Sequence, residues 1–263
     1  MTTPPVCLTV AGLDPSGGAG TIADIRTFSA FGCFPAAAIA SITFQNTTAV
    51  FGAEHQNAGT VRAQLEPIFA DYEVSSVKTG MLPTREVIEE TAAIMGEHSV
   101  EHLVVDPVVR STSGFDLIDD AALNSLIKTL FPLSSVITPN IPEAERISGM
   151  RIRTPGDIQA AGVRIQTMGA KNVLIKGGHL ENTATATDYL FFGDEVLTFD
   201  ADFIQTSSTH GTGCTLSAAI AANLALGKNL IEAVKISKAF VHEAIRTAPN
   251  IGRGHSPINI KPI

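Results

Sequence analysis

Short apolar runs alternate with longer amphipathic stretches along the first two thirds of the chain. Apolar runs that end near Gly, Asp, Thr or Lys predict buried strands over residues 6–11, 36–42, 76–79, 102–106, 135–138 and 172–176. Between them, apolar residues recur three and four positions apart, which predicts helices over 19–31, 60–72, 86–95, 120–130 and 157–168. This alternation is typical of an α/β protein with a parallel sheet covered by helices.

The pattern changes after residue 176. Extended segments are predicted over 187–192 and 195–203, two helices over 212–226 and 230–247, and an irregular tail from Pro249 onward. The uncharged stretch 27–53 is interrupted by Gly, Pro and polar residues, so it predicts a helix end, a strand and a loop rather than a membrane span. No internal repeat or linker-like charge run is present, and we expect one domain over residues 1–263.

Composition and charge narrow the class of protein. With 44% hydrophobic and 17% charged residues, the 263-residue chain is not of the disordered or fibrous class. Its net charge of −8 argues against nonspecific binding to nucleic acid or to an anionic membrane, which needs a positive field. Cys7, Cys33 and Cys214 are too widely spaced for a zinc site or a disulfide framework, and no basic residue precedes Arg26 as in a signal peptide. We therefore expect a cytoplasmic protein.

A glycine-rich turn, residues 12–20, lies between the first predicted strand and helix. Its glycines allow backbone N–H groups to approach an anion at the helix N-terminus, although its spacing is not that of a dinucleotide-binding fold. The alternative is a tight turn that binds nothing. Asp24, about one helical turn further on, either faces the crevice at the carboxyl ends of the strands or is a solvated helix residue.

Residues 210–215, His-Gly-Thr-Gly-Cys-Thr, precede a helix rich in Ala and Leu. The two glycines allow consecutive N–H groups to point at one spot, where the helix dipole adds positive potential. Such an anion hole suits the charge that develops on a transferred phosphoryl group. Cys214 would lie at this terminus, where we expect a lowered pKa and a thiol that can accept a proton. The alternative is a small buried cysteine at a helix start.

Three further strand ends carry candidate polar groups. Asp106 ends a hydrophobic strand, where carboxylates that bind Mg²⁺ commonly project toward phosphates. Asn140 and Glu143 fit the start of a helix with a capping box, and the alternative is that Glu143 lies near the metal. Lys176 could reach a nucleotide phosphate, although a lysine at a strand end is usually only solvated.

Taken in order, these segments resemble the hydroxymethylpyrimidine/phosphomethylpyrimidine kinases of the ribokinase-like superfamily. The resemblance covers nearly the whole chain and is carried by residues 11–20 with Asp24, 45–47, 78–82, 105–108, 138–144, 176–179 and 209–215. It implies a three-layer α/β/α fold with a mostly parallel central sheet. It also implies ATP-dependent phosphorylation of 4-amino-5-hydroxymethyl-2-methylpyrimidine to its monophosphate and then to the diphosphate, for thiamine biosynthesis.

The resemblance also implies roles for particular residues. Cys214 would be the catalytic base, in an anion hole completed by Gly211, Thr212 and Gly213. The pyrimidine would be bound by Gly12, Asp24, Gln45 and Met81. Mg²⁺ and the phosphates of ATP would be organised by Asp106, Asn140 and Glu143, with Lys176 on the nucleotide side. By analogy with the family, the protein would be a homodimer whose ligands are the pyrimidine and ATP.

The chain departs from the family pattern at two positions. Relatives commonly carry lysine where this chain has Thr112 and Ser207, and Arg110 is the nearest cation to the first of these. We therefore expect the absence of these lysines to weaken binding of the monophosphate more than binding of the neutral alcohol. Residues 111–115 and the neighbourhood of Gln45 are candidate lids.

Two alternative functions remain open at this point. A pyridoxal or other B6-vitamer kinase of the same superfamily would bind a similar heteroaromatic ring with a hydroxymethyl arm. The carboxamide of Gln45 favours the aminopyrimidine, because it can both donate and accept a hydrogen bond. A noncatalytic pyrimidine or nucleotide sensor is disfavoured by the complete set of candidate catalytic residues.

Overall fold

A single nine-stranded sheet forms the centre of the computed structural model, which describes residues 3–109, 117–178 and 185–262. The strand order is β3-β2-β1-β4-β5-β6-β7-β8-β9. All pairings from β2 to β7 are parallel, whereas β3, β8 and β9 pair antiparallel. The strands are β1 Val6–Leu13, β2 Phe34–Gln45, β3 Val50–His55, β4 Val74–Thr79, β5 Leu103–Val105, β6 Val136–Ile137, β7 Asn172–Ile175, β8 Thr185–Phe192 and β9 Glu195–Asp202.

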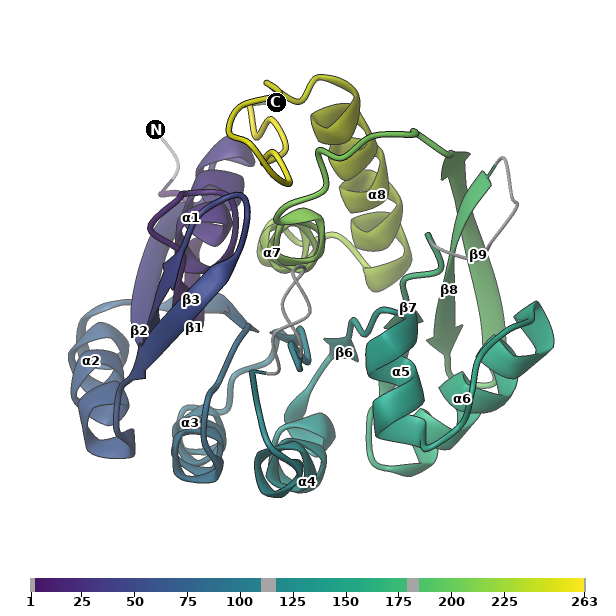
Figure 1. Cartoon of the computed structure of the whole chain (residues 1–263). Helices are drawn as coiled ribbons and strands as arrows, with labels where there is room; N and C mark the ends of the chain where they lie inside the picture. The colour runs from purple at the N-terminus through teal and green to yellow at the C-terminus, as the bar shows by residue number, and fades with distance from the viewer. Residues whose placement is uncertain (1–2, 110–116, 179–184, 263) are drawn as a thin grey trace.

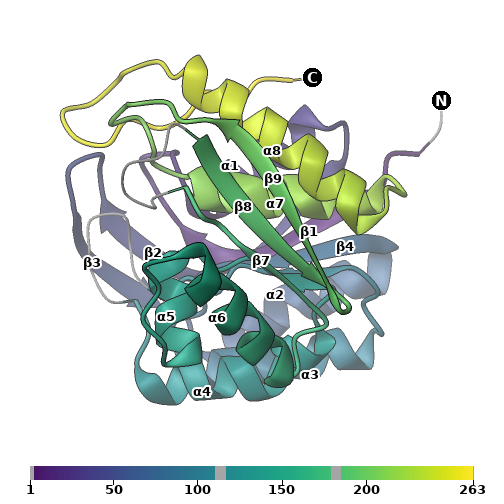
Figure 2. The ribbon, with the colours of Figure 1, turned by 90° about the vertical axis from the view of Figure 1, so that its right-hand side faces the viewer.

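Helices cover both faces of the sheet (Figure 1). One face carries α1 Gly20–Ala30, α7 Thr212–Ala225 and α8 Leu230–Arg246, and Figure 2 shows α7 behind β8 and β9 with α8 along their upper side. The other carries α2 Ala58–Asp71, α3 Arg85–Glu97, α4 Asp120–Thr129, the short 3₁₀ helix Phe131–Leu133, α5 Ile141–Ser148 and α6 Pro155–Thr167. The predicted three-layer fold with a mostly parallel sheet is therefore confirmed.

The two layers of core follow the alternation of side chains along each strand. In β5, Val104 packs with α7 and α8, whereas Leu103 and Val105 pack with the helices of the opposite face. Both faces of the central strands are buried, which explains why these strands are short continuous apolar runs. Because these strands are parallel, the polar residues that follow them lie at one edge of the sheet.

Two elements differ from the sequence prediction. The predicted loop before residue 53 contains β3, which pairs antiparallel with β2 in a register that sets Thr43 opposite Ala53. This strand lies at the sheet edge, and no alternation of buried and exposed residues identifies it. The helix α5 is only eight residues long, so its capping box is recognisable in the sequence but its apolar period is not. The lid candidate 111–115 lies outside the described residues.

No helix in the described part of the chain is long and apolar enough to cross a membrane. The three cysteines are free thiols, as the absence of a disulfide pattern predicts. Cys7 and Cys33 are buried in the core, and Cys214 is half-buried.

Candidate active site

A cavity of about 1080 Å³ lies at the carboxyl ends of the parallel strands. Its wall includes all the predicted site residues except Asp24. They come from the turns after β4, β5 and β7, from the ends of β1 and β2 and from the N-terminal ends of α5 and α7. The cavity is large enough for a nucleotide and a small second ligand.

Two glycine-rich turns form one side of the cavity and touch each other. Gly211, the residue before α7, has φ +85°, and a Cβ there would lie 1.8 Å from the carbonyl oxygen of Gly18. Gly18 in turn lies against the ring of His210, since a Cβ on Gly18 would lie 2.2 Å from His210 Cδ2. The glycines therefore allow the turn after β1 and the start of α7 to pack backbone against backbone.

Sequence reasoning missed the polar contact that joins these turns. His210 Nε2 donates to Asp14 Oδ2 over 2.8 Å, and the backbone N–H of Ala19 donates to the same oxygen over 2.9 Å. The other carboxylate oxygen accepts from Ser16 N and Ser16 Oγ. Both residues lie within segments that carry the family resemblance. The sequence alone does not distinguish Asp14 and His210 from ordinary turn residues, because their contact exists only in the folded structure.

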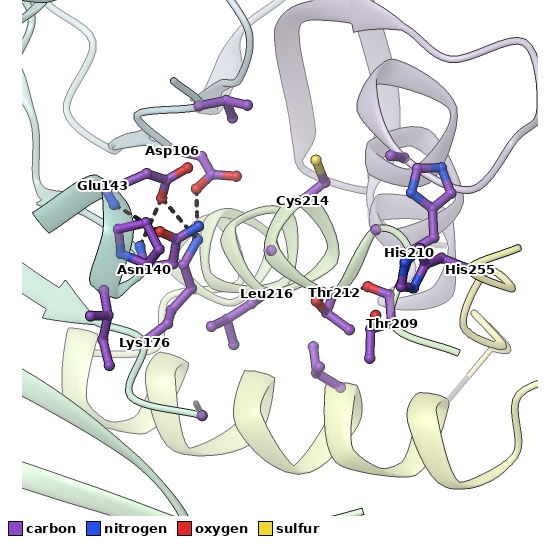
Figure 3. A pocket seen from close by; sticks show the side chains of 18 of the residues that line it. Asp106, Asn140, Glu143, Lys176, Thr209, His210, Thr212, Cys214, Leu216 and His255 are labelled. Atoms are coloured by element: carbon purple, nitrogen blue, oxygen red, sulfur yellow. Dashed lines mark hydrogen bonds and ion pairs between the residues drawn. The ribbon is translucent and has the colours of Figure 1, made fainter. Parts of the chain in front are cut away.

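Cys214 is the third residue of α7 and lies on the cavity wall, with the acidic residues on one side and His210 on the other (Figure 3). The backbone N–H of Gly20 donates to its sulfur. Burial raises the pKa of the thiol to about 11, and the positive charge of Lys78 opposes this rise only in part. The prediction that the helix N-terminus lowers this pKa is therefore wrong, because desolvation of the thiolate outweighs the favourable charges.

Asp24 lies behind the cavity wall rather than on it. Its carboxylate is fully buried, and Oδ2 accepts from Thr9 Oγ1 over 2.6 Å and from Lys78 Nζ over 2.8 Å. Burial raises the pKa of Asp24, and the charge of Lys78 opposes that rise. The expected hydrogen bond from Asp24 to a pyrimidine is replaced in this structure by an internal ion pair, and Asp24 is not a solvated helix residue either.

The opposite side of the cavity carries two carboxylates around one ammonium group (Figure 3). Lys176 Nζ lies 3.0 Å from Asp106 Oδ1 and 3.9 Å from Glu143 Oε2. Asp106 also accepts from Thr138 Oγ1 over 3.1 Å, and more weakly from Ser217 Oγ over 3.4 Å. Although burial lowers the pKa of Lys176, the two carboxylates raise it above its usual value. A cation is thus already held between Asp106 and Glu143.

Asn140 and Glu143 form the capping box that the sequence predicts. The Asn140 side chain accepts from Glu143 N over 2.9 Å, and Asn140 N donates to Glu143 Oε2 over 2.7 Å, which is a capping box. Both residues also line the cavity. Burial raises the pKa of Glu143 to about 7, while Lys176 lowers it and Asp106 raises it further. The cap therefore also fixes Glu143 beside Asp106.

The residues predicted to bind the pyrimidine lie near the first glycine turn. A Cβ on Gly12 would lie 3.1 Å from Met81 Cε, so Gly12 leaves room for the Met81 side chain on the cavity wall. Gln45, at the end of β2, helps to lower the pKa of the Asp14 carboxyl and is half-buried on the same wall. Gly12, Gln45 and Met81 line the same cavity as the acid and lysine cluster.

Comparisons with known protein families and solved structures agree with this arrangement of the site. The family model for phosphomethylpyrimidine kinase matches residues 14–259. A hydroxymethylpyrimidine/phosphomethylpyrimidine kinase of Staphylococcus aureus (strain MSSA476) is 42% identical over 260 residues, which cover 98% of this chain and 94% of the relative. The crystal structure of a phosphomethylpyrimidine kinase from Clostridium difficile is 42% identical, with a TM-score of 0.81 and coverage of 92% of this chain and 99% of that chain.

A second enzyme type has the same fold. The structure of a pyridoxal kinase from Staphylococcus aureus in complex with AMP-PCP and pyridoxal has a TM-score of 0.92 at 30% identity, and it covers 99% of this chain and 95% of that chain. The fold alone therefore does not separate the two substrates, whereas the family model and the more similar sequences do. The chain belongs to the phosphomethylpyrimidine kinase family.

Proposed function

We propose that this protein transfers the γ-phosphoryl group of ATP to the hydroxymethyl group of 4-amino-5-hydroxymethyl-2-methylpyrimidine, and then phosphorylates the monophosphate, for thiamine biosynthesis. The observation that carries this proposal is the position of Cys214. It stands at the start of α7, with the acid and lysine cluster on one side and His210 on the other, and it lines the same cavity as the Gly12, Gln45 and Met81 region. An alcohol bound in that region would have a proton acceptor beside it.

The chemistry follows from this arrangement. Cys214, as thiolate, takes the hydroxyl proton while the oxygen forms a bond to the γ-phosphorus and the bond from phosphorus to ADP breaks. The sulfur accepts the proton only as thiolate, and a pKa of about 11 makes that form a small fraction of the thiol at neutral pH. The N–H groups of Gly211 and Gly213 would face the charge that develops on the transferred group, whereas Thr212 N donates to Thr209 O over 3.3 Å.

The donor set on the opposite wall fits Mg²⁺. Asp106 and Glu143 supply two carboxylates that already enclose the ammonium group of Lys176. Within the described residues no three Cys, His, Asp or Glu side chains form a metal cluster, and Mg²⁺ typically takes one or two carboxylates together with phosphate oxygens and waters. Mg²⁺ would neutralise phosphate charge there, with Lys176 and Asn140 oriented toward the nucleotide.

A pyridoxal kinase is the second candidate, because a pyridoxal kinase structure shares nearly the whole fold. Gln45 favours the aminopyrimidine, since its carboxamide can pair with both a ring nitrogen and an amino group. Coupled assays with hydroxymethylpyrimidine, its monophosphate and pyridoxal in parallel would decide between them. A higher kcat/KM for pyridoxal than for either pyrimidine would refute the first candidate.

Replacement of the thiol tests the mechanism. We expect Cys214→Ala to lower kcat by about 10²-fold or more and to leave the KM for ATP nearly unchanged, because a proton acceptor acts in the chemical step. Cys33→Ala is the matched control, since Cys33 is a free buried thiol that does not line the cavity. A loss of only a few fold for Cys214→Ala would refute the base assignment.

The proposal extends to the assembly and location of the protein. We infer a homodimer and a cytoplasmic location by analogy with the family, and a single domain over the whole chain. The net charge of −8 supports small-molecule ligands rather than nucleic acid or membrane. Light scattering of the purified protein would test the dimer.

A further inference from the structure

A charged pair without solvent exposure lies beside the cavity. The side chains of Lys78 and Asp24 are both 0% exposed, and Lys78 Nζ lies 2.8 Å from Asp24 Oδ2. Asp24 Oδ1 has no hydrogen-bond partner, although the same carboxylate accepts from Thr9 through Oδ2. Burying such a pair stabilises a fold less than apolar residues of similar volume. Packing alone therefore does not account for it.

The pair belongs to two elements, β4 and α1, that both pack against the helix of Cys214. Lys78 is in β4, which packs against α7, and both Lys78 and Cys214 line the cavity. Cys214 packs against a cluster that contains Ala23, the residue before Asp24 in α1. Space for the ammonium group depends on Gly80, where a Cβ would lie 2.8 Å from Lys78 Nζ. The lysine, the carboxylate and the thiol thus meet where β4, α1 and α7 pack together.

Several groups surround the thiol, and their charges act in opposite directions. The positive charge of Lys78 lowers the pKa of Cys214, whereas Asp24 and, more weakly, Asp106 raise it. Although burial lowers the pKa of Lys78 itself, Asp24, Cys214 and Asp106 raise it above its usual value, so the ammonium group stays charged. The charges that act on Cys214 from the packed elements are those of Lys78 of β4, Asp24 of α1, Asp106 after β5 and Lys176 after β7, and the N–H of Gly20 also favours the thiolate. His210, before α7, lies on the other side of the thiol (Figure 3).

We propose that Lys78 is a positioning residue for the kinase reaction: it stabilises negative charge on the Cys214 sulfur, and Asp24 holds its ammonium group in place while opposing that charge. The inference rests on the proposed role of Cys214 as proton acceptor. When the sulfur takes the substrate proton, the negative charge moves from the sulfur to the substrate oxygen, and Lys78 remains beside both. The pair sets how much thiolate is present before that step.

Alkylation of the free protein tests the inference without catalysis. The rate of iodoacetamide addition to Cys214, followed by mass spectrometry across neutral to alkaline pH, reports the thiolate fraction. We expect Lys78→Met to slow the reaction by about tenfold near neutral pH, because an opposite charge at short range lowers a pKa by about one unit or more. Asp24→Asn should accelerate it several-fold. Changes of the alkylation rate in opposite directions are expected only if charge is the cause, because a packing defect would expose the thiol and accelerate alkylation in both variants.

The pair Lys238 and Asp188 supplies the matched control. Lys238 Nζ lies 2.7 Å from Asp188 Oδ2, and both residues line the same cavity. We expect Lys238→Met and Asp188→Asn to leave the alkylation rate of Cys214 within about twofold of the unmodified protein, because neither charge is among the largest influences on the pKa of the thiol. Equal effects from the two pairs would overturn the inference.

A double variant provides a test even if the single variants fail to fold. Lys78→Met with Asp24→Asn leaves no uncompensated buried charge, and we expect slower alkylation than in the unmodified protein because the lysine has the larger effect. An unchanged or faster rate, or single variants that shift in the same direction, would overturn the inference. Activity in Cys214→Ala would refute only the proton-acceptor role, whereas unchanged alkylation in the pair variants would refute only the role of Lys78.

Discussion

His210 Nε2 lies 2.8 Å from Asp14 Oδ2, and this contact joins the two glycine-rich turns that frame the active site. The turns are 196 residues apart in sequence. Every oxygen of the Asp14 carboxylate is hydrogen-bonded, with Ser16 and Ala19 as the backbone donors. The contact fixes the start of α7, and therefore Cys214, relative to the end of β1.

Removal of the Asp14 charge should destabilise the protein in a manner that depends on pH. Although burial raises the pKa of Asp14, hydrogen bonds from His210, Ser16 and Gln45 outweigh it and lower the pKa to about 2. A carboxyl group with a depressed pKa stabilises the fold above its unfolded value of 3.8, and this contribution is lost as the pH falls toward about 2. We expect Asp14→Asn to lower the free energy of unfolding by about 2 kcal/mol at neutral pH.

Urea denaturation at several pH values would check this prediction. The difference between Asp14→Asn and the unmodified protein should shrink as the pH falls below about 4. Asp194→Asn is a suitable control, because Asp194 is an exposed aspartate in the turn between β8 and β9. A deficit that stays constant down to the lowest pH at which the protein folds would contradict the charge argument.

Gly211 should tolerate no side chain. It has φ +85°, and a Cβ would lie 1.8 Å from the backbone oxygen of Gly18. Gly227 has φ +80° with open space around it, so Gly227→Ala introduces the same backbone strain without the clash. We expect Gly227→Ala to cost about 1 kcal/mol of stability and to keep activity, and Gly211→Ala to lose both activity and several degrees in Tm. Thermal denaturation and kcat for both variants would check this, and similar effects from the two would contradict the packing argument.

The sequence predicts the central part of the fold well because its strands are buried on both faces. Runs such as those of β5 and β7 are continuous and apolar, and the polar residue after each one marks the edge where the site forms. The edge strand β3 is missed because its residues are partly or fully exposed. Strand propensity and the alternation of apolar and polar residues give little information about such a strand.

The candidate site is predicted less completely, for a physical reason. A motif identifies which residues gather at the strand ends, but it does not say which of them face each other. Asp24 forms an ion pair with Lys78 behind the cavity wall, and burial raises the pKa of Cys214 although this residue lies at a helix N-terminus. Both outcomes depend on desolvation, which is set by the packing of α1 and α7 rather than by local sequence.

Gln45 should determine affinity for the pyrimidine and not for ATP. We expect Gln45→Leu to raise the KM for hydroxymethylpyrimidine by about tenfold or more, because an unpaired polar ring edge in a confined site costs about 1 to 3 kcal/mol. Gln56→Leu is the control, since Gln56 follows β3 outside the cavity wall. Steady-state kinetics with each substrate varied would check the prediction, and equal increases in both KM values would instead indicate a folding defect.

The final prediction concerns the position where relatives commonly carry lysine. Ser207 is exposed, lies between the cavity residues Thr206 and Thr209, and accepts a hydrogen bond from the ring of His255 through its backbone oxygen. Thr112, the other such position, lies outside the described residues. A lysine at residue 207 would add a cation at the cavity rim, and hydrogen bonds from a charged group to phosphate are about twice as strong as neutral ones.

We therefore expect Ser207→Lys to raise kcat/KM for the monophosphate by several-fold and to leave that for the neutral alcohol nearly unchanged. The gain should shrink as the ionic strength rises, because salt screens exposed charges. Gln159→Lys adds the same charge on the exposed face of α6, away from the cavity wall, and should change neither activity. Kinetics of both variants with both acceptors at low and high salt would check this. If the ratio of the two activities is the same in Ser207→Lys as in Gln159→Lys, the phosphate of the second substrate does not lie near residue 207.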